Sequence, residues 1–262
     1  MNHTSGNSNS TDNLIDRAAL LLGTVNSVFV LTGAGVSAES GIPTFRGADG
    51  LWKNYSAQEL ATPQAFQKDP VLVWEWYHWR QDLILKASPN AAHYALSAFE
   101  SIFEHFLLLT QNVDNMHRRA GSQRVLELHG NIFRARCCEC DRKTEYTGIQ
   151  GVSNDLPRCV CGGLLRPDVV WFGEAIPEYI WQDSLDFLSG TAVAMICGTS
   201  GVVWPAAAIP RIAMEQGVKT IEINLEPTPI SNAVDVSIRA KADVALPLLV
   251  RKITDRPTSK IS

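Results

Sequence analysis

The sequence predicts an α/β protein built on a doubly wound parallel sheet that carries two small insertions. Two observations indicate this class: apolar runs of strand length alternate with segments of helical periodicity, and one such run passes directly into a glycine-rich turn. The chain has 262 residues, of which 45% are hydrophobic and 19% charged. A chain of this length and composition buries a sizeable core, so we expect one large domain with insertions.

The first half of the chain supplies alternating elements. Residues 13–22, "NLIDRAALLL", have helical periodicity, and 27–32, "SVFVLT", follow as a buried strand. A long helix is expected to begin after its N-cap Asp69, with Pro70 in the first turn, and to run to Lys86. A second amphipathic helix over 89–102 precedes the strand "FLLLT" at 106–110, and Gly121 ends a short helix after it.

The second half repeats the alternation. We expect strands in "VLEL" (125–128), "VVWFGE" (169–174), "AVAMICGTS" (192–200), "KTIEINLE" (219–226) and "ADVALPLL" (242–249). A helix is expected in "PAAAIPRIAMEQG" (205–217). Strands that alternate with helices in this way are typical of a parallel sheet covered on both faces.

Charge and composition exclude several functions. The formal net charge is −4 with acidic and basic residues interspersed, which argues against a nucleic-acid partner. No apolar run reaches the roughly 18 residues of a membrane span, so no membrane partner is expected. The N-terminal segment is polar and has no Arg before Arg17, which fits neither a secretory signal nor a transit peptide. We therefore expect a cytoplasmic protein with a disordered tail over 1–11.

A glycine-rich turn follows the first strand. Gly33, Gly35 and Ala38 fit the pattern G-x-G-x-x-[G/A], in which backbone N–H groups and a helix N-terminus hold a diphosphate. The alternative is a tight turn that uses glycine for a positive φ. An ordinary dehydrogenase would also place an acid about 20 residues on, at the end of its second strand, to hold the ribose. Here Asn224 and Glu226, at a later strand end, are better placed for that contact.

Cysteines crowd into one segment. Five of the six lie between positions 137 and 161, as two short pairs with 18 residues between them. The pairs are Cys137-x-x-Cys140 and Cys159-x-Cys161. Four thiolates at this spacing predict one structural zinc ion, which cannot activate water because its coordination sphere is full. Two alternatives stay open: Cys138 could replace Cys137 as a ligand, or the cysteines could be core residues.

Polar side chains follow two of the expected strands. Gln111, Asn112 and Asp114 come after "FLLLT", and His129 comes after "VLEL". Because the carboxyl ends of parallel strands meet at one crevice, we expect these groups to converge there. Histidine is the side chain best suited to proton transfer near neutral pH, although a lone His is more often structural. His93 is assigned to the structural class.

Six motifs together resemble the sirtuin (Sir2) family in wording and in order. They are "GAGVSAESGIPTFRG", "TQNVDNMH", "LHGN", "GGLLRPDVVWFGE", "GTSGVV" and "INLE". The resemblance extends over residues 13–251 and implies a Rossmann-like sheet, NAD as co-substrate and acyl-lysine proteins or peptides as partners. The implied activity is the NAD-dependent removal of acyl groups from lysine side chains.

The resemblance also implies roles for individual residues. In this family the acyl oxygen attacks C1′ of the nicotinamide ribose, nicotinamide leaves, and a histidine acts as base on a ribose hydroxyl. His129 matches that base, and Asn112 and Asp114 match catalytic residues that, with Gln111, hold the nicotinamide and its ribose. Matches to the cofactor-binding residues are Gly33, Ala34, Gly35, Ala38, Phe45, Arg46, Gln111, Asn112, Asp114, Gly198, Thr199, Ser200, Asn224, Glu226 and Ala242.

Two segments are matched to mobile and substrate-binding parts of the family. The segment "GIPTFRG" resembles the cofactor loop in which Phe45 and Arg46 close over the nicotinamide and keep water out; simple loop packing of Phe45 is the alternative. The strand to which the substrate peptide adds matches Val170, Phe172, Gly173 and Glu174.

The acyl group is addressed by the long predicted helix. Tyr77 and Arg80 are three residues apart, so their side chains share a face. A guanidinium and a phenol together suit a carboxylate. The pair resembles the sirtuin subclass specialised for acidic acyl-lysines such as succinyl- and malonyl-lysine, with Ala61 matching a small residue that leaves room for the chain. The alternative is a packed Tyr and a solvated Arg.

These observations divide the chain into segments. We expect a Rossmann-like NAD-binding domain over 12–50, 88–133 and 168–253, a helical acyl-selecting insertion over 51–87, a zinc-binding insertion over 134–167 and a flexible tail over 254–262. The expected protein is a monomeric desuccinylase and demalonylase with weaker deacetylase activity. Alternatives are a deacetylase-preferring sirtuin, a protein ADP-ribosyltransferase and a non-catalytic module that binds acyl-lysine or senses NAD.

Overall fold

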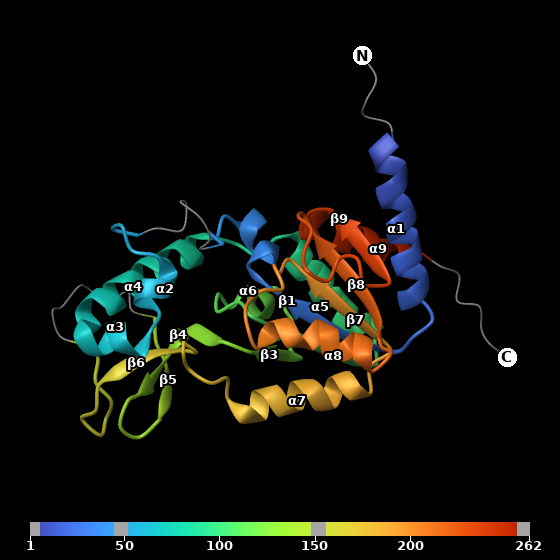
Figure 1. Ribbon diagram of the computed structural model, residues 1–262. Coiled ribbons are helices and arrows are strands. Elements are labelled where there is room, and N and C mark those ends of the chain that lie inside the picture. The colour runs from blue at the N-terminus through green and yellow to red at the C-terminus, as the bar shows by residue number, and fades with distance from the viewer. Residues whose placement is uncertain (1–5, 45–51, 148–155, 256–262) are drawn as a thin grey trace, which may run out of the picture.

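A six-stranded parallel sheet forms the centre of the computed structural model, which describes residues 6–44, 52–147 and 156–255 (Figure 1). Its strand order is β3-β2-β1-β7-β8-β9, and every pairing is parallel. The strands are β1 (Ser27–Thr32), β2 (His105–Thr110), β3 (Val125–Glu127), β7 (Val193–Cys197), β8 (Lys219–Asn224) and β9 (Val236–Arg239). The predicted doubly wound sheet is confirmed, and its strand order reverses between β1 and β7.

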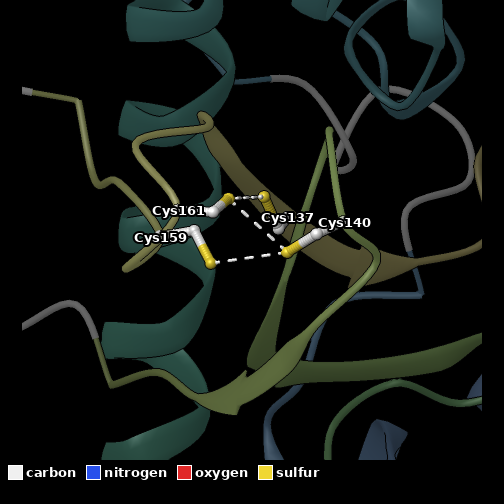
Figure 2. A group of neighbouring side chains, drawn as sticks. All are labelled: Cys137, Cys140, Cys159 and Cys161. Carbon is white, nitrogen blue, oxygen red and sulfur yellow. Dashed lines mark hydrogen bonds between the residues drawn. The ribbon is translucent and has the colours of Figure 1, made fainter.

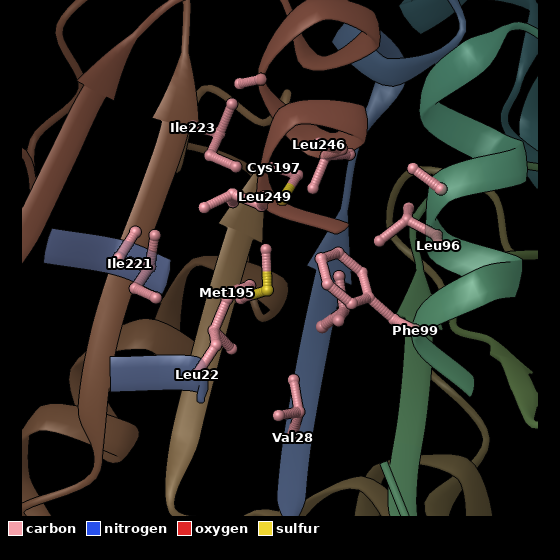
Figure 3. Close-up of a cluster of buried hydrophobic side chains, with 14 of the residues drawn as sticks. Leu22, Val28, Leu96, Phe99, Met195, Cys197, Ile221, Ile223, Leu246 and Leu249 are labelled. Atoms are coloured by element: carbon pink, nitrogen blue, oxygen red, sulfur yellow. The ribbon is translucent and has the colours of Figure 1, made fainter. Parts of the chain in front are cut away.

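Helices cover both faces of this sheet. On one face α1 (Gly6–Leu22), α5 (Ala91–Ile102) and α9 (Ala242–Thr254) pack together, as the close-up in Figure 3 shows for Leu96, Phe99 and Leu246. On the other face lie α7 (Glu178–Ser189) and α8 (Ile209–Glu215). Successive residues of β1 alternate between the two clusters, since Val28 contributes to the first and Phe29 to the second. No helix of the described residues is long and apolar enough to cross a membrane.

Two terminal elements differ from expectation. The first helix begins at Gly6 rather than at residue 13. "ADVALPLL", predicted as a strand, is instead the start of α9, because Ala242, Ala245, Leu246 and Leu249 are buried at the 3- and 4-residue spacing of a helix. The last strand, β9, lies in "VSIR" just before it. A run of apolar residues is compatible with a strand or with a helix. Here the apolar face packs on α5, and this packing favours the helix.

A helical insertion and an antiparallel ribbon pack against each other beside the large sheet (Figure 1). The insertion contains α2 (Ala57–Leu60), α3 (Pro63–Lys68) and α4 (Pro70–Lys86), and the ribbon has strand order β5-β4-β6. Its strands are β4 (Gly130–Cys137), β5 (Lys143–Glu145) and β6 (Leu165–Val169). The short helix α6 (Met116–Arg119) precedes β3. As predicted, Asp69 caps α4, accepting from the N–H of Leu72 at 2.9 Å.

Buried polar bonds hold α4 on the ribbon. The indole N–H of Trp74 donates to the carbonyl of Leu165 at 3.0 Å, and the amide of Gln81 donates to the carbonyl of Ile132 at 2.6 Å. Because these donors and acceptors are buried, leaving one unpaired would cost about 1–3 kcal/mol. The orientation of the long helix is therefore fixed by the ribbon rather than by solvent.

The segment "VVWFGE" is only partly a strand. β6 ends at Val169, and Gly173 has a φ of +86°. The N–H of Val170 donates to the carbonyl of His129 at 2.9 Å, and the N–H of Phe172 donates to the carbonyl of Ala61 at 2.9 Å. The predicted strand stops because its backbone leaves the ladder to join two other segments.

Core packing of α5 is expected to dominate stability. Phe99 is fully buried beside Phe103, with 5.8 Å between ring centroids, so Phe99→Ala should lower the free energy of unfolding by about 3–5 kcal/mol. Tyr94 is on the same helix but is 54% exposed, so Tyr94→Ala should change the free energy of unfolding by less than about 0.5 kcal/mol. Urea unfolding of both variants measures the difference; equal losses would contradict this account of the core.

Candidate active site and metal centre

Three strand-end loops are joined through their backbones at the reversal point of the sheet. The N–H of Gly33, after β1, donates to the carbonyl of Cys197 at 3.1 Å, and the N–H of Gly35 donates to the carbonyl of Gly198 at 2.8 Å. The N–H of Gly198 in turn donates to the carbonyl of Ile223 in β8 at 2.9 Å. The carboxyl ends of β1, β7 and β8 thus form one edge, as the sequence predicts.

Glycine is needed here for close approach. A Cβ on Gly35 would lie 2.8 Å from the carbonyl oxygen of Gly198, and one on Gly198 would lie 2.5 Å from the backbone nitrogen of Val36. Gly33 has a φ of −131°, so a positive φ does not explain it, whereas Gly198 has a φ of +59°. Two short 3₁₀ helices, Ala34–Val36 and Ala38–Ser40, complete the turn.

Further candidate cofactor residues line the same edge. Thr199 and Ser200 follow Gly198, and the hydroxyl of Ser200 is buried without a hydrogen-bond partner among the described residues. An orphaned buried hydroxyl beside crowded glycines fits a polar ligand such as a dinucleotide. Asn224 ends β8, and its amide donates to the carbonyl of Glu226 at 2.9 Å. Ala242 opens α9, and Phe45 and Arg46 lie outside the described residues.

A buried carboxylate that sequence reasoning missed supports this loop. Glu222 is 1% exposed and accepts hydrogen bonds from Thr228, from Ser237 at 2.6 Å and from Arg239 at 3.1 Å. Burial raises the pKa of Glu222, but these hydrogen bonds outweigh it and lower that pKa overall. Arg239 also donates to the carbonyl of Glu226 at 3.1 Å, so the carboxylate fixes the loop. The sequence feature that could have revealed Glu222 is an acidic residue between two isoleucines of a predicted strand.

His129 has a defined hydrogen-bonding state. Its Nδ1 lies 3.0 Å from the carbonyl oxygen of Gln111, which only accepts, so Nδ1 carries the proton and donates. Burial lowers the pKa of the ring, while that hydrogen bond opposes the shift. The neutral ring therefore has its lone pair on Nε2 at neutral pH, the state that a general base needs.

Asn112 and Asp114 are held by one hydroxyl, that of Ser37 in the turn after β1. Ser37 donates to the carboxylate of Asp114 at 2.7 Å and accepts from the amide of Asn112 at 3.1 Å. That amide also donates to the carbonyl of Gly33 at 3.1 Å. Burial raises the pKa of Asp114, against the hydrogen bonds from Met116 and Ser37. The two candidate catalytic residues are thus tied to the glycine turn.

His93, placed in the structural class from the sequence, belongs to the same network. It is fully buried, and burial with the nearby charge of Arg119 lowers its pKa to about 4. Its Nδ1 accepts from the N–H of Asn90 at 3.1 Å, so Nε2 carries the proton and donates to Ser37 at 3.3 Å. Ser37 and His93 are 56 positions apart, so no local pattern could have linked them.

Tyr77 and Arg80 lie together inside the insertion. Tyr77 is fully buried, and its hydroxyl accepts from the indole N–H of Trp171 at 2.8 Å, which leaves the phenolic proton free to donate. The guanidinium carbon of Arg80 is 4.8 Å from the ring centroid of Trp76 and 5.5 Å from that of Tyr77. Burial raises the pKa of Tyr77 and lowers that of Arg80. Arg80 is half-buried, with its guanidinium against these two rings.

Four cysteine sulfurs converge at the end of the ribbon (Figure 2). They belong to Cys137, Cys140, Cys159 and Cys161. All lie within 4.8 Å of one another, with separations of 3.4, 3.5 and 3.8 Å along the dashed lines of Figure 2. Tetrahedral Zn²⁺ with Zn–S bonds of about 2.3 Å requires sulfurs about 3.8 Å apart, so the set fits zinc. Cys138 is exposed and outside the cluster, which excludes it as the alternative ligand in this structure.

The local backbone explains this convergence. Backbone N–H groups of Cys140 and Glu139 lower the pKa of the Cys137 thiol to about 7, which favours the thiolate that a metal binds. A Cβ on Gly163 would lie 2.8 Å from the Cys137 sulfur, so glycine leaves room for it. With four thiolates the site is closed, and the metal has a structural role.

A parallel sheet of this order with a crowded glycine turn at its reversal point defines a dinucleotide-binding type of α/β protein. Residues 33–205 match the model of the Sir2 family. "NAD-dependent protein deacylase 2" of Pyrobaculum aerophilum is 50% identical over 237 residues, covering 90% of this chain and 94% of its own. The chain belongs to the Sir2 family.

Solved structures of this family are similar to the chain over almost its full length. A Sir2 homologue variant in complex with 2′-O-acetyl ADP ribose has a TM-score of 0.89 and 43% identity, covering 94% of this chain and 99% of its own. A Sir2 protein with a p53 peptide and NAD⁺ has a TM-score of 0.82 and 30% identity, covering 91% and 98%.

Zinc binding is expected to need Cys140 but not Cys138. Cys140→Ser removes one of four thiolates, so purified protein should lose its stoichiometric zinc and the ribbon should unfold locally. Cys138→Ser should keep one zinc per chain. Metal analysis by mass spectrometry, with thermal melting of both variants, checks this; equal zinc loss in both would contradict the assigned ligands.

Proposed function

We propose that this chain is an NAD-dependent protein deacylase that transfers the acyl group of an acyl-lysine to ADP-ribose and releases nicotinamide. The observation that carries the proposal is the position of His129: its Nδ1 is fixed by Gln111, and Gln111 also donates to the hydroxyl of Thr199 in the β7 loop at 3.0 Å. A base at neutral pH thus stands beside the edge that suits a dinucleotide.

Each group of residues has a chemical task in this reaction. Bound NAD would supply an electrophilic ribose carbon, C1′, to which the acyl oxygen would bond as the bond from C1′ to nicotinamide breaks. His129 accepts a proton at Nε2 from a ribose hydroxyl, which its neutral state allows. Asn112 and Asp114 orient the nicotinamide end, and Ser37 keeps both side chains in place. Such positioning is worth more than any single contact, because reacting groups must lie close and aligned.

Peptide binding is proposed for the segment 170–174. The N–H groups of Val170 and Phe172 donate to the carbonyls of His129 and Ala61, and those of Trp171 and Glu174 are bonded within the segment. The segment therefore connects the proposed base with the acyl-selecting insertion. A substrate strand that added to it would place its acyl-lysine between the two.

An acidic acyl group is the substrate we propose. Tyr77 is buried and Arg80 is half-buried among aromatic rings, and a charged acyl terminus would exchange its hydration for a guanidinium and a phenolic donor. Ala61 is small, and its carbonyl accepts from the N–H of Phe172, which holds it beside the proposed substrate segment. Acetyl-lysine would bind without this charge-assisted contact and react more slowly.

Nicotinamide release on matched peptides is the direct test. Succinyl-lysine and acetyl-lysine versions of one peptide are incubated with and without NAD, and products are read by mass spectrometry. We expect both to be deacylated only with NAD, and succinyl to be preferred. Acetyl preference would refute the acidic-acyl proposal alone. Transfer of ADP-ribose to protein without deacylation would refute deacylase activity.

Loss of the base should be selective for chemistry. His129→Ala is expected to lower kcat by at least about 100-fold with little change in peptide affinity. His105→Ala, at a side chain that is 61% exposed, is the control and should leave kcat unchanged. Steady-state kinetics and peptide titration measure both; near-normal turnover by His129→Ala would overturn the assignment.

The pH profile follows from the pKa of the same residue. Because burial holds the pKa of His129 below its usual value of about 6.5, the ring is already neutral at pH 7. We expect kcat/KM to be flat through neutral pH and to fall only as acid protonates the ring below about pH 6.5. An acid limb centred above pH 7 would contradict this state of the ring.

Acyl selectivity should depend on Arg80. Arg80→Met removes a charge-assisted contact worth about 1.5–3 kcal/mol, so kcat/KM for succinyl-lysine should fall about 10- to 100-fold while that for acetyl-lysine changes little. Lys86→Met, an exposed cation on the same helix, is the matched control and should alter neither. Equal losses on both substrates would mean that Arg80 only supports the helix.

A further inference from the structure

A charged cleft is lined by residues of β3, β4 and the start of α7. Its volume is about 350 Å³. The charged residues that line it are Arg118, Glu127, Arg134, Arg136, Lys143 and Asp168. Four cations against two carboxylates give the lining a net positive charge of two, in a chain whose net charge is −4. The cleft is thus a local positive site on an acidic protein.

Three cations of the ribbon, two of which line the cleft, lie in one register, an arrangement that lowers the stability of the strand pairing. Lys143 on β5, Arg136 on β4 and Arg166 on β6 stand directly opposite one another across the three strands. Like charges in register destabilise a sheet. Asp168 lies 3.2 Å from Lys143, and Glu174 pairs with both Arg136 at 3.4 Å and Arg166 at 2.5 Å, so two carboxylates serve three cations. One positive charge more than the carboxylates offset is left on this face, and a local rule broken in this way is typical of a functional surface.

The carboxylates of the cleft are more buried than two of its cations. The carboxylates are covered, since the Glu127 and Asp168 side chains are 9% and 6% exposed and both pair with Arg134, at 2.6 and 3.3 Å. Arg118 and Lys143 are 42% and 48% exposed. Arg118 pairs with Glu127, and Lys143 pairs with Asp168. A lysine has three N–H donors and an arginine has five, which is more than these two ion pairs use. A ligand entering the cleft therefore meets cations and N–H donors first.

The cleft is continuous with the proposed substrate segment. Val169 and Val170 line it, and Val170 also begins the segment 170–174 to which we assign the substrate peptide. A bound peptide would therefore have flanking residues within reach of the cleft. Carboxylate side chains are the groups whose chemistry the exposed cations complement.

We propose that this cleft binds acidic side chains flanking the acyl-lysine of a protein substrate. The inference rests on the proposed function. It adds a preference for acidic sequence context, separate from the choice of acyl group, which we assign to Tyr77 and Arg80 beside Trp171. Free carboxylate ligands would share the chemistry but would not be covalently joined to the acyl-lysine.

The test compares peptides that share one acyl-lysine and differ in their flanks. One pair carries Asp and Glu on the N-terminal side or their amides, and a second pair carries them on the C-terminal side. We expect kcat/KM of the wild type to favour the acidic member of one pair about fivefold, and the preference to shrink in high salt. No preference in either pair overturns the proposal.

Variants locate the effect. Lys143→Glu should remove the preference and leave the amide-flanked peptides unchanged, with Asp168 still paired to Arg134. Lys219→Glu is the matched control, an exposed lysine 2.9 Å from Asp235 on the far part of the sheet. An equal loss in Lys219→Glu would show a general charge effect and overturn the proposal. Thermal melting confirms that both variants are folded.

A binding measurement separates this inference from the deacylase proposal. The same peptides, fluorescently labelled, are titrated by anisotropy with wild type and Lys143→Glu. Tighter binding of an acidic peptide that Lys143→Glu abolishes supports the cleft even if no turnover is seen. Equal affinity for acidic and amide peptides in both proteins overturns it, whatever the result for turnover.

Discussion

The backbone bonds between the loops after β1, β7 and β8 are the constraint on which the rest of the site depends. Gly35 donates to Gly198, and Gly198 donates to Ile223, with no room for a Cβ at either glycine. The three carboxyl ends are consequently locked as one unit. The orphaned hydroxyl of Ser200 and the anchoring hydroxyl of Ser37 both follow from that lock, because each stands within three residues of a locked glycine.

Ser37 links the locked glycine turn to the candidate catalytic residues Asn112 and Asp114. Its hydroxyl accepts from His93 and Asn112 and donates to Asp114, so its hydrogen-bonding capacity is fully used. Removing any partner would leave a buried polar group unsatisfied, at about 1–3 kcal/mol. The network therefore has one arrangement. A site whose polar groups have a single satisfied arrangement is preorganised, which the transfer chemistry that we propose requires.

The sequence predicted what is local and missed what is tertiary. Buried parallel strands are continuous apolar runs, so β1, β2, β7 and β8 could be located, and the four cysteines could be grouped by spacing alone. The prediction of a strand in "ADVALPLL" was wrong, because an apolar run alone does not distinguish the two-residue repeat of a strand from the 3.6-residue repeat of a helix. The partnership of His93 with Ser37 is visible only in the fold. The roles of Tyr77, Arg80 and His129 came from family resemblance, and they stay predictions.

In the reaction that we propose, zinc would affect the acyl end of the site through packing rather than chemistry. A metal held by the four cysteines would close the ribbon at Cys137, and the ribbon holds α4 through the bonds that Trp74 and Gln81 make to backbone carbonyls. Tyr77 is on that helix, and its hydroxyl is bonded to Trp171, just beyond β6. A disordered ribbon would release both partners at once. If Tyr77 selects the acyl group as we propose, the closed metal site would set the geometry of that selection without contacting the acyl group.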